Sequence, residues 1–144
     1  MTAMPSRPWM RPEPLENASP DRPLCQKCGL FRFAKTPFMK PFIPEGYTHR
    51  ALGVGEAPGK HEDEVSGRPF TGKAGELLDK KLKETGWSKK DVALHNATIC
   101  RPQNNAEPTM TQIRCCRPFL LQVIRDLNPR FIIGFGTILS LIHI

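Results

Sequence analysis

The stretch Ala51-Leu52-Gly53-Val54-Gly55-Glu56-Ala57-Pro58-Gly59 decides the fold of this chain. Its first half is apolar or glycine and predicts a short strand, while the glycine and proline residues after it predict a rigid turn. Two phosphate-binding patterns fail here, because Val54 stands where a Walker loop needs glycine and Pro58 stands where a dinucleotide loop needs it. The turn instead presents Glu56 at a strand end, where a carboxylate can position water or stabilise a developing cation. The alternative is a solvated loop acid.

The segments that follow alternate between helix and strand patterns. Apolar spacing predicts a helix over residues 73–85, a strand over 92–99 and a helix over 109–127, which Pro118 should kink or split. The run Phe131-Ile132-Ile133-Gly134-Phe135 is typical of a parallel strand buried on both faces. This order predicts an α/β fold: a three-layer α/β/α sandwich with a short central parallel sheet. Ligands of such sheets bind beyond the carboxyl ends of the strands.

The chain has 144 residues, a formal net charge of +7 and a pI near 9.4. The length suits one domain, and the basic charge suits a polyanionic partner, although a basic protein need not have one. No run approaches the ~20 apolar residues of a membrane span, and no signal-peptide pattern is visible at the start. We expect residues 1–23, which are rich in proline, to form a disordered arm and residues 24–144 to form an incomplete domain. The chain stops soon after the third predicted strand, so the sequence suggests truncation.

Five cysteines without a secretory signal favour metal ligation in a reducing compartment. Cys25 and Cys28 form a C-x-x-C pair, and Cys100 and Cys116 lie far downstream. Four thiolates could hold zinc or an iron–sulfur cluster. Cys115 competes for the fourth place, although helical phase favours Cys116 on the inward face. The alternative is that the downstream cysteines are ordinary buried residues.

Two further side chains suit a flat, polar ligand. Phe70 lies in the loop Gly67-Arg68-Pro69-Phe70-Thr71-Gly72, where it could stack on a ring. Asn96 both donates and accepts hydrogen bonds, which suits the edge of a base. Taken singly, each has a plainer interpretation, as a core residue and a turn former.

These residues together resemble the family 4 uracil-DNA glycosylases, the iron–sulfur type. The similarity extends from about Cys25 to Phe135 and is carried by G-E-A-P-G, E-D and G-R-P-F-T-G-K-A-G-E-L-L-D within residues 55–79. It is also carried by Asn96 four residues before Cys100-Arg101-Pro102, and by the later C-R-P-F-L.

The resemblance implies a role for each candidate residue. Glu56 would orient water or stabilise the sugar cation, and backbone groups at Ala57 would contact a uracil carbonyl. Phe70 would stack on the extruded base, Asn96 would read its edge, and Glu62 would lie near C5, where a thymine methyl group would clash. The ligands of a structural [4Fe–4S] cluster would be Cys25, Cys28, Cys100 and Cys116, which leaves Cys115 spare.

Two departures from the family pattern matter. The loop at Glu64-Val65-Ser66 is about one residue longer than usual, which could shift Phe70. The family's His-Pro-Ser loop is absent, since only His143 lies near the end, and a chain without this loop would be weak or inactive.

The leading hypothesis is a DNA repair glycosylase that flips out uracil and hydrolyses its N-glycosidic bond, leaving an abasic site. The resemblance implies a monomer that acts on single- or double-stranded uracil-containing DNA, in the cytoplasm and at the nucleoid if the source is bacterial. The alternatives are an inactive four-cysteine nucleic-acid-binding module with a cluster or zinc, and a hydrolase of another base.

Overall fold

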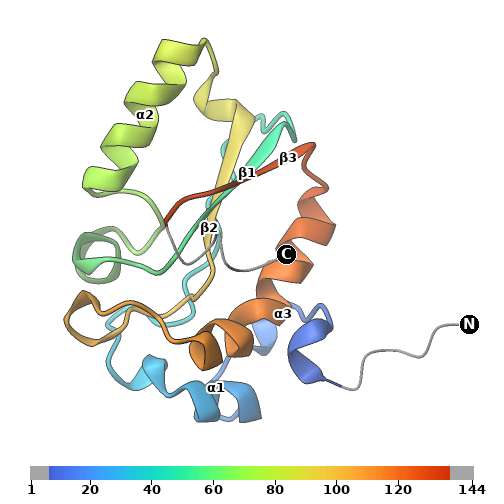
Figure 1. The fold of residues 1–144 in the computed structure, drawn as a ribbon, viewed down its shortest axis with the longest axis vertical. Coiled ribbons are helices and arrows are strands. Elements are labelled where there is room, and N and C mark those ends of the chain that lie inside the picture. The colour runs from blue at the N-terminus through green and yellow to red at the C-terminus, as the bar shows by residue number, and fades with distance from the viewer. Residues whose placement is uncertain (1–6, 137–144) are drawn as a thin grey trace, which may run out of the picture.

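The structure is a computed structural model, and it describes residues 7–136 of the chain (Figure 1). Its α-helices are α1 (Pro23–Cys28), α2 (Lys73–Thr85) and α3 (Met110–Leu127), and its strands are β1 (Ala51–Gly55), β2 (Val92–Asn96) and β3 (Phe131–Gly134). Short 3-10 helices cover Pro8–Met10, Leu15–Asn17, Leu30–Arg32, Lys89–Asp91 and Gln103–Asn105, and a π-helical turn covers Glu62–Ser66.

The three strands form a parallel sheet in the order β2-β1-β3. All five residues of β1 are buried, because this strand has a neighbour on each side and a helix over each face. Leu52 and Val54 point toward α3, where they pack with Ile113, Leu120 and other side chains. Alternate positions of the sheet point the other way, as the period of a strand requires.

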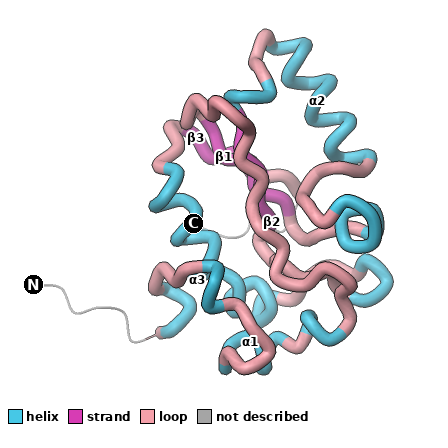
Figure 2. Tube along the Cα trace, turned by 180° about the vertical axis from the view of Figure 1, so that it is seen from behind, coloured by secondary structure: helices cyan, strands magenta, loops and turns pink. Residues whose placement is uncertain are grey.

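Helices α2 and α3 cover opposite faces of this sheet (Figures 1 and 2). Leu82 of α2 packs with Ala51 and Val92, whereas the α3 side chains pack with Leu52 and Val54. The predicted three-layer α/β/α arrangement is therefore confirmed, with the core divided into one cluster on each side of a short sheet.

Two strands differ from the sequence prediction. β2 ends at Asn96 rather than at residue 99: Ala97 N and Thr98 N donate in succession to the carbonyls of Gly55 and Glu56, whereas only alternate N–H groups of a parallel strand face the same neighbour. β3 was expected to be buried on both faces, and this is wrong: Phe131 and Ile132 are exposed. Among the described residues β3 is an edge strand, so its outer side has no cover.

Helix α3 is a single helix from Met110 to Leu127, so of the two predicted effects of Pro118 the split is wrong, whereas the kink stays a prediction. Thr109 caps its start, accepting from Gln112 N while the Gln112 side chain accepts from Thr109 N. Buried side chains on both sides of the proline, including Cys116 and Phe119, hold the helix against the core. Packing therefore offsets the hydrogen bond that proline removes.

The described part of the predicted arm, from Arg7 onward, lies against α3 (Figure 1). Glu13 N donates to the carbonyl of Pro118, and the Glu13 carboxylate binds Arg22. The division of the chain into an arm and a domain stays a prediction. None of the helices within residues 7–136 is long and apolar enough to cross a membrane.

Candidate active site and cysteine pocket

A cleft of about 270 Å³ opens at the carboxyl ends of the strands. Gly55 and Asn96, the last residues of β1 and β2, are direct partners in the sheet. The cleft is lined by all five residues predicted to act on a base, together with four others: Gly55, Glu56, Ala57, Glu62, Phe70, Ala74, Asn96, Phe135 and Gly136. The fold thus brings together residues as far apart in sequence as Gly55 and Gly136, at the edge where parallel sheets bind ligands.

The backbone holds Phe70 and Asn96 close to the floor of the cleft. A Cβ added to Gly55 would lie 2.5 Å from Asn96 Oδ1 and 2.7 Å from the Phe70 ring, so only glycine fits between them. Phe70 has a φ of 59°, a left-handed conformation that is costly for a bulky residue and that clusters at functional sites. Gly75 of α2 lies directly against the Phe70 carbonyl and leaves no room for a side chain. The first turn of α2 therefore fixes this strained residue.

The sequence did not identify Phe135 and Gly136 as part of this site. The Phe135 ring meets the Phe70 ring edge to face at 5.5 Å between centroids. Gly136 has a φ of 105°, and a side chain there would collide with the Glu56 carboxyl group. Both residues directly follow β3, as Glu56 directly follows β1. The rule that ligands bind at the carboxyl ends of parallel strands could therefore have predicted them.

Glu62 lines the cleft, and one of its carboxylate oxygens is buried. Its Oε1 accepts a hydrogen bond from Gly59 N at 3.2 Å, whereas its Oε2 is buried without a hydrogen-bond partner in the described structure. The Nδ1 atom of His61 lies 3.8 Å from Oε2, too far for a hydrogen bond. A buried carboxylate oxygen without a donor is costly, and a donor from a ligand would remove that cost.

The π-helical turn Glu62–Ser66 accounts for the additional residue of this loop. Gly67 N donates to the carbonyl of Glu62, an i→i+5 bond that encloses one residue more than an α-helical turn. The extra residue is accommodated there, and Phe70 still lines the cleft. A shift of Phe70 relative to the family, which the longer loop could cause, stays a prediction.

Asp63 anchors the same turn from inside the protein. Its carboxylate is buried and accepts from the backbone N–H groups of Lys35 and Thr36 at 3.1 and 2.8 Å. Arg101, which follows Cys100, lies 3.9 Å from the Asp63 carboxylate and donates to Asn105 Oδ1 at 2.8 Å. These contacts connect the cleft loop to the segment that carries the cysteines.

The cysteines line a second, apolar pocket. Its wall is formed by Arg22, Cys25, Cys28, Phe31, Phe38, Ile99, Cys100, Cys115 and Cys116. Cys25, Cys100 and Cys116 pack in one buried cluster that does not include Cys115, although Cys115 is also buried. The fold thus brings the four predicted ligands together and leaves Cys115 beside them.

Hydrogen bonds and burial shift the pKa values of these thiols. The Cys116 side chain, in hydrogen-bond contact with Cys28, lowers the pKa of Cys28 to about 7, and this same contact, with burial, raises the pKa of Cys116. Burial raises the pKa of Cys100 to about 12. Buried neutral thiols become thiolates readily only when a cation or metal compensates the charge.

The donor set consists of thiols, which suit zinc or an iron–sulfur cluster. Within residues 7–136, no group of three or more His, Cys, Asp or Glu side chains is arranged to hold a metal ion. A [4Fe–4S] cluster takes one thiolate at each of four iron corners. The Sγ atoms of Cys25 and Cys100 also accept hydrogen bonds, from Arg22 Nη1 and Phe38 N, both at 3.3 Å. Such bonds to sulfur are typical of iron–sulfur sites.

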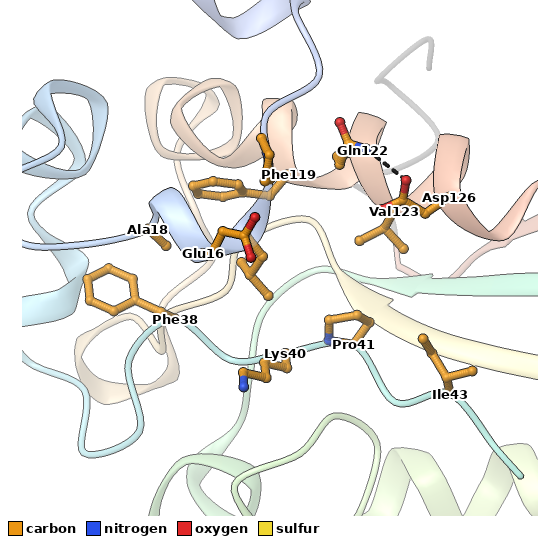
Figure 3. Close-up of a pocket in the computed structure, with 12 residues that line it drawn as sticks. Glu16, Ala18, Phe38, Lys40, Pro41, Ile43, Phe119, Gln122, Val123 and Asp126 are labelled. Atoms are coloured by element: carbon orange, nitrogen blue, oxygen red, sulfur yellow. Dashed lines mark hydrogen bonds between the residues drawn. The ribbon is translucent and has the colours of Figure 1, made fainter.

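A larger groove of about 610 Å³ lies elsewhere, between the N-terminal segment, residues 38–43 and α3 (Figure 3). Phe119 and Val123 of α3 form one wall, and Lys40 and Ile43 lie on the opposite side. None of the residues predicted to act on a base lines it. Residues 137–144, including His143, lie outside the described residues.

Known proteins are similar to this chain over most of its length. The uracil DNA glycosylase superfamily matches residues 45–141. Three curated relatives are each named type-4 uracil-DNA glycosylase. The protein from Pyrobaculum aerophilum is 43% identical over 117 residues, 79% of this chain and 56% of the relative. The protein from Saccharolobus solfataricus is 39% identical over 78% of this chain and 50% of the relative. The protein from Thermotoga maritima is 45% identical over 60% of this chain and 45% of the relative.

The chain spans about half the length of these relatives. The matched region contains β1, the cleft loop, β2, α3 and β3. The chain belongs to the uracil DNA glycosylase superfamily, and the relatives that it matches are type-4 enzymes.

Proposed function

We propose that this chain is the part of a uracil-DNA glycosylase that binds the flipped base and begins its excision. The observation that supports this most directly is the single cleft in which Glu56, Phe70 and Asn96 meet at the ends of β1 and β2. Its volume of about 270 Å³ lies just below the ~300–1,000 Å³ of drug-sized sites, which suits one base. Curated relatives named for this activity support the same conclusion.

The cleft residues would divide the chemistry among them. A uracil inside DNA must be flipped out, at a cost of a few kcal/mol that is lower for a mismatched base. Phe70 stacks on the base, Asn96 hydrogen-bonds its edge, and backbone groups at Ala57 contact a carbonyl. The C–N bond then breaks to give an oxocarbenium-like sugar and a uracil anion, and water adds to the sugar. Glu56 orients that water or stabilises the sugar cation.

Glu62 would contribute to selectivity. Its carboxylate is fixed at the cleft by Gly59 N and stands beside Gly72, where an added Cβ would lie 3.0 Å from Oε2. We place it near the C5 edge of the base, where a thymine methyl group would lack room.

The cysteine pocket would hold a [4Fe–4S] cluster on Cys25, Cys28, Cys100 and Cys116. In this fold the cluster would supply cross-linking, since two ligands come from α1 and the others from the segment after β2 and from α3. The protein would act as a monomer on single- or double-stranded uracil-containing DNA, in the cytoplasm and at the nucleoid of a bacterial host.

A single-turnover assay of base release tests this function. DNA containing uracil, hypoxanthine or xanthine, single- or double-stranded, is incubated with the chain and with a version extended to the length of its relatives. We expect release of uracil, and its loss in Glu56→Gln but not in Glu45→Gln, an exposed acid outside the cleft. DNA binding without release from either length would contradict the proposal, and preferential release of another base would reassign the substrate.

A further inference from the structure

Arg22 is an arginine that the fold buries, with only 7% of its surface exposed. A buried charge is costly unless it is paired and hydrogen-bonded. Its Nε and Nη2 atoms donate to the Glu13 carboxylate at 3.0 and 2.8 Å, the fork geometry that arginine offers. Its guanidinium carbon lies 4.2 Å from the centroid of the Phe119 ring. These contacts occupy the Nε and Nη2 atoms and one face of the guanidinium group.

The remaining nitrogen, Nη1, faces the cysteine pocket. It donates to Cys25 Sγ at 3.3 Å and to the carbonyl of Cys115 at 3.0 Å. Arg22 immediately precedes α1, whereas Cys115 and Phe119 belong to α3. One side chain therefore joins the helix of the C-x-x-C pair to the helix of Cys116.

The N-terminal segment completes this arrangement. Glu13 N donates to the carbonyl of Pro118 in α3, so the carboxylate that neutralises Arg22 is itself held on that helix. Figure 3 shows Glu16 and Ala18 of the same segment beside Phe119, along one wall of the groove. The Arg22 guanidinium group is thus buried next to the sulfur atoms, whereas the Glu13 side chain keeps 26% of its surface exposed.

We infer that Arg22 is a positioning residue of the four-thiolate site, which fixes Cys25 Sγ and compensates the negative charge of a cluster bound there. This inference depends on the cluster proposed above. Arginine keeps its charge at any ordinary pH, and hydrogen bonds to sulfur and local charge both set the reduction potential of an iron–sulfur cluster. Glu13 opposes this effect, since its carboxylate neutralises part of the guanidinium charge.

A purely structural clip and an electrostatic partner predict different results. If Arg22 only fastens α1 to α3, removal of either member of the Arg22–Glu13 pair loosens the site in the same way. If its charge acts on the cluster, Arg22→Gln shifts the reduction potential to a more negative value, whereas Glu13→Gln shifts it to a more positive value. The sign of the shift therefore separates the two roles.

The experiment uses the full chain, purified without oxygen, as wild type, Arg22→Gln, Arg22→Lys, Glu13→Gln and the control Arg125→Gln, an exposed arginine on α3. Iron and sulfide content, cluster loss to a chelator and the reduction potential are measured. We expect opposite shifts of potential for Arg22→Gln and Glu13→Gln, and cluster loss about 10-fold faster or more in Arg22→Gln. Arg22→Lys should keep the potential but lose the cluster faster, because lysine lacks the fork.

The outcomes distinguish this inference from the cofactor proposal. A wild-type chain without iron and sulfide would overturn the cofactor, and the inference with it. A loaded wild type whose Arg22→Gln variant matches Arg125→Gln in potential and cluster loss would overturn only the role of Arg22. Shifts of the same sign in Arg22→Gln and Glu13→Gln would also overturn it. If Arg22→Gln does not bind a cluster, the reduction potentials of Arg22→Lys and Glu13→Gln test the inference. A positive shift in Glu13→Gln with an unchanged potential in Arg22→Lys supports it, and an unchanged potential in Glu13→Gln overturns it.

Discussion

At the scale of single residues, Asn96 is the clearest test of base reading. Asn96 is 6% exposed and lies at the floor of the cleft, where Gly55 separates it from the Phe70 ring. Asn96→Asp replaces a group that donates and accepts with one that only accepts, so it repels a uracil carbonyl. We expect uracil release to fall about 10²–10³-fold, as for other lost donors to a developing anion.

Single-turnover rates on uracil-containing DNA measure this effect. The matched control is Asn128→Asp at the C-cap of α3, which does not line the cleft and has a left-handed backbone that aspartate tolerates. An unchanged rate and an unchanged preference for uracil over cytosine in Asn96→Asp would remove Asn96 from base reading.

Also at the scale of single residues, His95 should make the free energy of unfolding depend on pH. Burial lowers the pKa of His95 from 6.5 to about 4, and its Nε2 atom is buried without a hydrogen-bond partner in the described structure. Below pH 6.5 the unfolded chain takes up a proton that the folded chain refuses. The free energy of unfolding should therefore be highest above pH 6.5 and should fall by about 3 kcal/mol on the way to pH 4.

Urea unfolding of wild type and His95→Leu at several pH values isolates this contribution. Leucine removes the titrating group without breaking a hydrogen bond seen for Nε2, so the free energy of unfolding of His95→Leu minus that of wild type should increase as the pH falls below 6.5. Parallel profiles between pH 6.5 and pH 4 would contradict the assignment.

At the scale of elements, the start of α2 determines the shape of the cleft. Gly75 lies against the carbonyl of Phe70, so Gly75→Ala forces α2 away from that loop. Overpacking of this kind costs about 1–3 kcal/mol, and here it should also displace the Phe70 ring, which we propose stacks on the base. We expect the rate of base release to fall by more than the smaller fraction of folded protein can explain.

Gly86→Ala, at the other end of the same helix, is the matched control. Gly86 has a φ of 79° and nothing lies near its missing Cβ, so alanine costs roughly 1 kcal/mol of backbone strain and leaves the cleft unchanged. Chemical denaturation and uracil release are compared for both variants. Equal activity in the two would show that α2 does not position Phe70.

At the scale of the whole molecule, the cysteine pocket joins segments that the sheet does not hold together. Cys116→Ser should prevent binding of the proposed cluster and lower the midpoint of thermal unfolding. The reason is that α1, the segment after β2 and α3 would then no longer be cross-linked through the cluster. Cys115→Ser should keep the cluster, since Cys115 lies outside the buried cluster of the other thiols. Iron content and thermal unfolding with and without a chelator measure both effects. A reversed result would make Cys115 the ligand.

Much of the site could be predicted from the sequence, because its motifs are local. Glu56 follows its strand directly, and Phe70 is framed by Gly67 and Gly72, so short-range patterns located both. The exposure of β3 and the continuity of α3 across Pro118 could not be predicted in this way. Both depend on neighbours distant in sequence: the edge position of β3 and the packing around the proline.

The sequence by itself determined the α/β order and indicated Glu56, Phe70, Asn96 and the cysteines, because these are set by local spacing and side-chain chemistry. The family resemblance added Ala57, Glu62 and the choice of Cys116 over Cys115. Only the tertiary structure decided that Gly55 and Asn96 are sheet partners, that Phe135 and Gly136 close the cleft, and that Arg22 faces Cys25. The physical reason is that contacts between distant segments depend on strand register and on the packing of helices. Neither is encoded in any single stretch of the chain.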